Sequence, residues 1–297
     1  MKKKIVLMLT VIMLIGLAGC GKNQINIKET GTSDNNEQMV QNIYENKRTE
    51  VKQKISEIKE RLPETSAEDK GTCGSKAKWY YKDNTLIIYG EGVITEDTWH
   101  KSNIVINTVV IDSGITKLGN NMFSGLGSEV GKNIENFYIA DGLEEIGSST
   151  FVNCDCLSEI VLPPSLYFID GYTFASCDSL KKIYMTDGVE KIGDSAFTGC
   201  KSLDSIFIPK TVLAIGNGVF TGCNNLSDIQ ISKDNRIFSE KNNCIINNDT
   251  KTLIYAINKD FSIPDDILCI AEDAIYGCEI DSLVIPEGVK EIEERAF

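Results

Sequence analysis

Cysteine is the residue type in this chain that offers the most chemistry. The 297 residues include ten cysteines and a single histidine. Four cysteines follow one another at intervals of 23 residues, namely Cys154, Cys177, Cys200 and Cys223. A disulfide or metal ladder is one interpretation, but side chains that repeat in step point in parallel, which opposes bridging. A free cysteine behaves as a small buried apolar residue, so the column favours core packing.

The sequence contains no pattern that predicts a catalytic or cofactor site. One histidine leaves little room for acid–base catalysis by imidazole or for a histidine-based zinc site. There is no phosphate-binding glycine loop, no His-Glu-x-x-His and no Gly-x-Ser-x-Gly. Acidic residues outnumber basic ones by 43 to 30, and the formal net charge of −13 argues against nucleic-acid binding. We therefore expect no catalytic residue, cofactor, metal or nucleic-acid partner.

A repeat of about 23 residues organises most of the chain and must position these cysteines. Each unit combines a short strand, a turn, an Ile-Gly pair and a helical or irregular return segment, on which Phe precedes Cys by three residues. One unit cannot bury its apolar face alone, so we expect the units to stack as coils. The predicted core positions are Phe151, Cys154, Phe174, Cys177, Phe197, Cys200, Phe220 and Cys223.

The strand register predicts about eight coils, the last of them incomplete. The first strand residues fall at positions 109, 137, 160, 183, 206, 229, 261 and 283. Two units are longer than the others: one has an extra loop over 125–133, and the other has two β-prone runs over 243–255 that predict a hairpin. The predicted fold class is an α/β solenoid, a right-handed array with one short parallel strand per coil.

The middle residue of each strand should point away from the core, because strand side chains alternate. This outward column runs through Val110, Tyr138, Val161, Tyr184, Phe207, Gln230, Ser262 and Val284. An exposed apolar and aromatic stripe is typical of a partner site. The alternative is that the rings simply stack on one another. The candidate binding residues are Tyr138, Val161, Tyr184, Phe207 and Gln230.

Three segments of different composition precede the repeats. Residues 1–19 carry three lysines and then an apolar run of thirteen residues, which is too short for a membrane span and predicts a signal peptide. Residues 20–36 are polar and predict a flexible tether. Residues 37–63 have apolar side chains at helical spacing, which predicts an amphipathic helix. That helix either pairs two copies as a short coiled coil, stands alone, or docks on the following domain.

The sequence Leu17-Ala18-Gly19-Cys20 resembles the cleavage box of bacterial lipoproteins. The resemblance implies cleavage before Cys20, lipidation of Cys20, and export to the outer side of a bacterial membrane or envelope. Membrane lipid would then be one partner, since two or more acyl chains anchor a protein stably. The alternatives are an ordinary signal peptide or a membrane anchor with an incidental cysteine.

The repeat units resemble a known family. The strings SLKKIYMTDGVEKIGDSAFTGC and SLDSIFIPKTVLAIGNGVFTGC are similar to BspA-type leucine-rich repeats of bacterial surface proteins. The segment that begins GTCG resembles the entry strands of such arrays and predicts a β cap over 71–103, with a hairpin around Asp83-Asn84. The array itself then covers 104–297, and the resemblance extends over about three quarters of the chain.

The resemblance implies a non-catalytic surface protein whose array binds extracellular or envelope proteins. Adhesion to host or matrix components is the expected role. A structural or self-associating envelope protein is the alternative, and an enzyme is the least favoured hypothesis.

Overall fold

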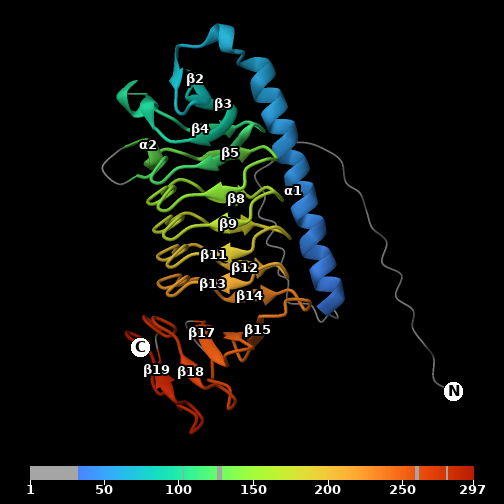
Figure 1. Cartoon of the computed structure of the whole chain (residues 1–297), viewed down its shortest axis with the longest axis vertical. Helices are drawn as coiled ribbons and strands as arrows, with labels where there is room; N and C mark the ends of the chain where they lie inside the picture. Colours follow the sequence, from blue (N-terminus) through green and yellow to red (C-terminus); the bar gives the residue numbers. More distant parts are fainter. Residues whose placement is uncertain (1–32, 103, 126–128, 258–260, 279) are drawn as a thin grey trace, which may run out of the picture.

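The computed structural model describes residues 33–102, 104–125, 129–257, 261–278 and 280–297. These residues form a stack of coils with one long helix along its side (Figure 1). The predicted signal peptide, Cys20 and the tether up to residue 32 lie outside the described residues. Within the described ranges, no helix has the length and hydropathy needed to cross a membrane. The solenoid, its hairpin cap and the amphipathic helix confirm the predicted fold class.

Each regular coil contributes a first strand to one face of the stack, called here the first-strand face. These strands are β4 (Thr108–Ile111), β6 (Asn136–Ile139), β8 (Glu159–Val161), β10 (Lys182–Tyr184), β12 (Ser205–Ile208) and β14 (Asp228–Ile231). Paired neighbours run parallel and in repeat register, as Ile206 and Ile229 do in β12 and β14. Their alternating apolar residues point into the stack, because successive strand side chains lie on opposite sides.

A second short strand in each coil lies where a helical or irregular return segment was expected. These strands are β5 (Ile115–Leu118), β7 (Glu145–Ile146), β9 (Phe168–Ile169), β11 (Lys191–Ile192) and β13 (Ala214–Ile215), again parallel. A glycine follows β5, β7, β11 and β13, and it is required by the close approach of the preceding coil. A Cβ on Gly193 would lie 2.5 Å from the backbone nitrogen of Gly171. The repeated Ile-Gly pair therefore sets how closely the coils stack.

Three antiparallel strands cover the first coil. They are β1 (Asp69–Thr72), β2 (Lys76–Lys82) and β3 (Thr85–Ile94), and a 3-10 turn at Thr98–Ser102 follows them. Asp83 and Asn84 join β2 to β3 with φ angles of 47° and 55°, as a tight hairpin turn requires. The first half of β3 pairs with β4 and its second half with β5. One long strand therefore begins both columns of strands.

A ladder of aromatic rings fills the centre of the stack. Phe123, Phe151, Phe174, Phe197 and Phe220 stack nearly parallel, with centroids 5.0 to 5.9 Å apart. Trp99 closes the ladder at the cap, with its ring 5.4 Å from Phe123, and Tyr255 closes the other end against Phe220. All five phenylalanines are fully buried. Stacked rings at this spacing add to the hydrophobic gain of burial.

The two long units depart from the regular coil. The first carries the short helix α2 (Glu129–Lys132). The second carries the predicted hairpin, built from β16 (Cys244–Asn247) and β17 (Thr252–Ala256), with β15 (Phe238–Lys241) added on its edge and β18 (Cys269–Ile270) and β19 (Glu291–Ile292) beyond it. The strands predicted at 261–263 and 283–285 do not form. The hairpin stands between β14 and these segments, so they find no partner in the first-strand sheet (Figure 1).

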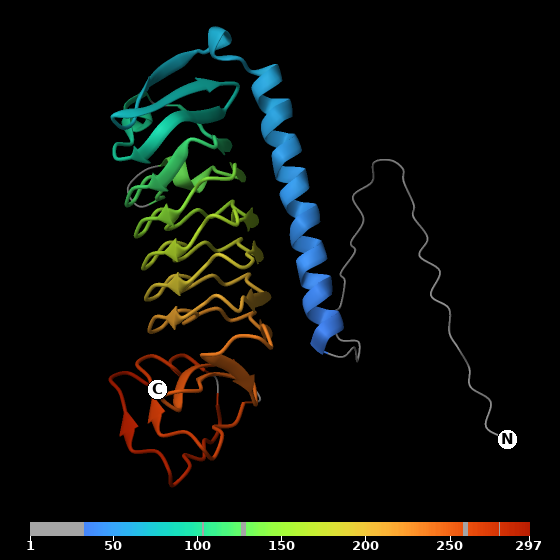
Figure 2. The ribbon, with the colours of Figure 1, turned by 45° about the vertical axis from the view of Figure 1, so that its right-hand side comes forward.

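The helix α1 (Ser33–Arg61) lies along the first-strand face and runs opposite to the order of the coils (Figure 2). It begins before the predicted boundary at residue 37, so the end of the predicted tether is helical. It leads through an exposed turn at Glu64–Ser66 into β1. Its apolar stripe is buried against the array and is not available for a coiled coil with a second copy. Of the three alternatives that the sequence leaves open, the structure shows docking.

Candidate binding surface

The first-strand face carries the predicted binding residues, and the apolar stripe of α1 packs on the first four of its strands, β4, β6, β8 and β10. Val110 is fully buried and Val161 is 5% exposed, while Tyr138 and Tyr184 are half-buried. The prediction that this part of the column lies on an open face is therefore wrong. The reason is geometric: one helical turn advances about 5.4 Å and neighbouring strands lie about 4.8 Å apart, so successive turns of α1 meet successive coils.

The apolar contact between α1 and the array is a cluster of its own, separate from the core. The helix and the residue after it contribute Tyr44, Val51, Ile55, Ile58 and Leu62, all less than 9% exposed. The cap contributes Tyr80 and Ile87, and the array contributes Val110 and Val161, with Tyr138 and Tyr184 packed at the margin. The Tyr44 hydroxyl donates to the carbonyl oxygen of Leu162 at 2.9 Å. Burial raises the pKa of Tyr44, Tyr138 and Tyr184.

Arg48 is the most buried charged residue at this contact, with 3% of its surface exposed. Its guanidinium donates to the carbonyl oxygen of Ile139 at 2.8 Å and to a carboxylate oxygen of Asp141 at 2.7 Å. Lys52 Nζ lies 2.7 Å from the other oxygen of Asp141. Partial burial opposes ionisation of Asp141, but the hydrogen bonds from Lys52 and Arg48 outweigh it and lower the pKa of its carboxyl group.

Basic side chains of the helix meet acidic side chains of the array along the same contact. Lys59 pairs with Asp112 at 2.5 Å, and Lys47 pairs with Glu159 at 2.7 Å. The Lys47 ammonium also lies 5.5 Å from the centre of the Tyr184 ring. Polar contacts continue to the start of the helix, where Thr186 donates to Gln41 and Ser232 donates to Glu37. Complementary charge therefore fixes the position of the helix along the array.

The helix does not fill the face. A cleft of about 340 Å³ remains between α1 and the array, and Tyr138 and Val161 of the predicted site line it together with Lys47, Lys54 and Glu159. A smaller cleft of about 250 Å³ lies beside the end of the helix, next to Tyr80 and Tyr89. Two of the five predicted binding residues thus meet at one cleft, on the edge of α1 and not in the open.

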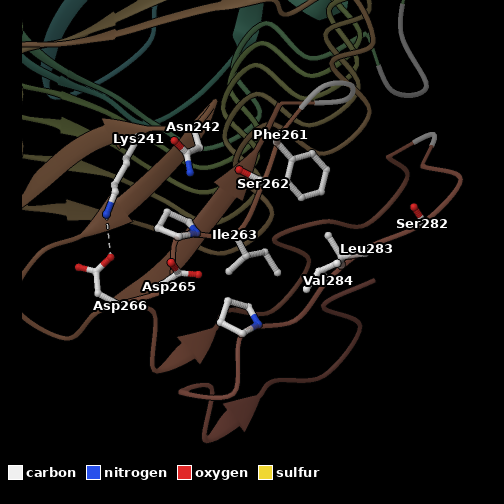
Figure 3. A pocket seen from close by; sticks show the side chains of 12 residues that line it. Lys241, Asn242, Phe261, Ser262, Ile263, Asp265, Asp266, Ser282, Leu283 and Val284 are labelled. Atoms are coloured by element: carbon white, nitrogen blue, oxygen red, sulfur yellow. Dashed lines mark hydrogen bonds and ion pairs between the residues drawn. The ribbon is translucent and has the colours of Figure 1, made fainter.

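The lower part of the column lies outside the cluster that α1 forms. Phe207 and Gln230 are half-buried, as Tyr138 and Tyr184 are, but neither of them belongs to that cluster. Ser262 and Val284, farther along, line a hollow of about 620 Å³ between the segments 261–266 and 282–286 (Figure 3). Lys241 and Asp266 form an ion pair at its rim, 2.9 Å apart. Sequence reasoning missed this hollow, because it depends on two strand segments that remain unpaired.

The cysteine column lies in the core. Cys154, Cys177, Cys200 and Cys223 are buried, and all cysteines among the described residues are free. Each of the four thiols donates to the carbonyl oxygen of a ladder phenylalanine in the preceding coil, at 3.0 to 3.3 Å. Burial raises the pKa of Cys177, and hydrogen bonding between neighbouring thiols raises that of Cys200. A buried thiol whose pKa is raised in this way is neutral and unreactive at ordinary pH.

Comparison with known proteins places the array. Residues 129–250 and 254–297 match the model of the BspA-type leucine-rich repeat region, in six copies. The described part of the chain holds no group of three or more His, Cys, Asp or Glu that could bind a metal ion. A search of the curated proteins finds no match.

Three solved structures are similar in fold. A leucine-rich repeat protein from Eubacterium ventriosum has a TM-score of 0.68 at 22% identity, covering 77% of this chain and 63% of that one. The pneumococcal vaccine antigen PcpA has a TM-score of 0.58 at 17% identity, covering 77% and 67%. A leucine-rich cell surface protein from Faecalibacterium prausnitzii has a TM-score of 0.54 at 21% identity, covering 77% and 73%. The chain thus spans less than two thirds of the Eubacterium protein.

Proposed function

The chain belongs to the BspA-type leucine-rich repeat family, and from that premise we propose that it is an exported, non-catalytic protein whose array binds other proteins at the cell surface. Adhesion to host or matrix components is the role we favour. The names of two relatives in fold, a vaccine antigen and a cell surface protein, support this assignment. The signal-like residues 1–19 and Cys20 support export and a lipid anchor.

The observation that carries the proposal is the part of the first-strand face that lies outside the apolar cluster of α1. Phe207 and Gln230 project from neighbouring strands that pair in register, so they stand side by side. The two side chains are only partly buried, whereas the strand residues beside them, Ile206, Ile208 and Ile229, are buried. An aromatic side chain beside a polar one, on a rigid sheet, is a common composition for the energetic centre of a protein interface.

The test is a binding screen with the full-length chain against immobilised matrix glycoproteins, followed by substitution of the two residues. We expect the double variant Phe207→Ala with Gln230→Ala to lose at least about tenfold in affinity for any protein found, because truncation of a central aromatic residue costs that much or more. Leu213→Ala is the matched control, since Leu213 is 58% exposed and follows β12 in the same coil.

Two outcomes would contradict the proposal. In the first, no matrix or envelope protein binds the folded chain. In the second, binding occurs but Leu213→Ala weakens it as much as the double variant does, which would place the contact elsewhere on the array.

A further inference from the structure

The part of the first-strand face under α1 has the composition of a binding site that is already occupied. Its apolar side chains would be exposed if the sheet were open. The helix α1 lies directly over them and over this part of the predicted binding column. We propose that this part of the face recognises an amphipathic helix with basic residues beside its apolar stripe, that α1 is its internal occupant, and that a helix of the same chemistry from a partner protein takes the place of α1.

The contacts of α1 specify the chemistry of the partner helix. Apolar side chains are needed at the spacing of Tyr44, Val51, Ile55 and Ile58, which lie on one side of a helix. Basic side chains are needed beside that stripe, because they face the acidic residues Asp112, Asp141 and Glu159 of the array. This charge pattern suits a basic helix and opposes an acidic one, because like charges that face each other across a contact repel.

The helix α1 leaves some buried polar atoms at this contact without a hydrogen bond, and it leaves part of the face uncovered. The Nε atom of Arg48 and one carboxylate oxygen of Glu37 are buried without a hydrogen-bond partner in the described structure. An unpaired buried polar atom costs free energy that a better-matched helix would not lose. The clefts of about 340 and 250 Å³ beside α1 leave apolar and aromatic surface uncovered. A helix with larger side chains at those positions would bury more of the face than α1 does.

The attachment of α1 allows it to leave. The turn that follows the helix, Pro63 to Ser66, is exposed, and none of the residues of the 3-10 turn is buried. The exposed turn does not hold the helix in place. The helix is held by its contacts with the first-strand face and with the cap. Because α1 is tethered, its local concentration at the face is on the order of millimolar, so a partner helix must bind substantially tighter than α1 to replace it.

The experiment measures binding of a fluorescent synthetic peptide, residues 36–62, to the full-length chain. In one variant, Val51→Glu places an acid in the apolar contact and unseats α1. A second, milder variant carries Lys47→Glu, Lys52→Glu and Lys59→Glu and keeps the apolar stripe. We expect each variant to bind the peptide at least tenfold tighter than the unaltered chain, since its own helix competes less well.

The matched control is a peptide with the same three lysines changed to glutamate. This control peptide should bind the two variants at least tenfold more weakly than the unaltered peptide does. The order of the two affinities should reverse when Asp112, Asp141 and Glu159 of the array are changed to lysine. Circular dichroism and urea denaturation establish that each chain is folded.

The proposal is overturned if a folded variant binds neither peptide, or if both peptides bind equally. It is also overturned if the unaltered chain forms dimers by exchanging α1, because the occupant would then be a second copy. None of these outcomes affects binding through Phe207 and Gln230, so this inference and the proposed function fail separately.

Discussion

At the scale of single residues, the ladder phenylalanines explain why one residue type recurs at a fixed step. Each ring lies against the rings of the coils before and after it, and each is sealed from solvent. The cysteine three positions later fills the remaining space, and its thiol donates a hydrogen bond to a phenylalanine carbonyl oxygen. A larger side chain at that position would meet the next coil, so a small apolar residue with a weak donor fits.

Replacing one ladder ring should destabilise the whole array. We expect Phe174→Ala to lower the free energy of unfolding by about 3–5 kcal/mol, since it removes two ring contacts and leaves a cavity in a packed core. Urea denaturation followed by circular dichroism measures the change. Leu213→Ala should change the stability by less than about 0.5 kcal/mol, because its side chain is exposed. Equal effects of the two changes would show that the ladder is not the main source of stability.

At the scale of elements, α1 is held by an apolar stripe and by a row of charge pairs. Arg48 and Lys52 share the carboxylate of Asp141, and this pairing lowers the pKa of Asp141 below its ordinary value of 3.8. A carboxyl group with a lowered folded-state pKa stabilises the fold above its unfolded pKa, and this contribution is lost as the pH falls through the folded pKa. The attachment of α1 should therefore weaken in acid.

The variant Asp141→Asn tests this dependence. We expect it to be less stable than the unaltered chain by at most about 1 kcal/mol at pH 6, because 44% of the Asp141 side chain is exposed and solvent screens the pair. The difference should shrink below pH 3.8 and vanish as the pH falls through the folded pKa. Urea denaturation across the pH range measures it. Glu91→Gln is the control, since the Glu91–Lys76 pair is 72% exposed on both sides; a constant difference at all pH values would refute the assignment.

At the scale of the whole molecule, the direction of α1 sets which end of the array lies next to the proposed membrane anchor. The helix begins beside Ser232 and ends beside the cap. Twelve residues lie between Cys20 and Ser33, and the thirteen Cα–Cα steps reach about 45 Å at most. If Cys20 is lipidated as we propose, the anchor joins the molecule at the start of α1, beside the later coils and far from the cap.

The variant Cys20→Ala tests the anchor. We expect it to move the protein from the membrane fraction to the soluble fraction of a producing bacterium, because the acyl chains supply the membrane affinity. Fatty-acid labelling should be lost at the same time. Cys156→Ala is the control, since Cys156 is exposed but lies within the array. Membrane association that survives the Cys20 change would contradict a lipid anchor at this residue.

The sequence by itself determined the repeat and its interior. The steps of 23 residues between Phe151, Phe174, Phe197 and Phe220 locate the coils, and the hairpin turn at Asp83-Asn84 locates the cap. Such features are readable because they rest on local spacing and on the burial that every unit needs. The helical spacing over 37–63 likewise predicted a helix with one apolar side.

Only the tertiary structure decided which surface that helix covers and which strands remain unpaired. Arg48 and Asp141 are 93 residues apart in the chain, and their contact depends on how turns of α1 match the spacing of coils. The same is true of Val284, whose 83% exposure follows from the hairpin that separates its segment from β14. Local patterns show which side chains need burial, but the partner that buries them is chosen by the sum of contacts between distant segments.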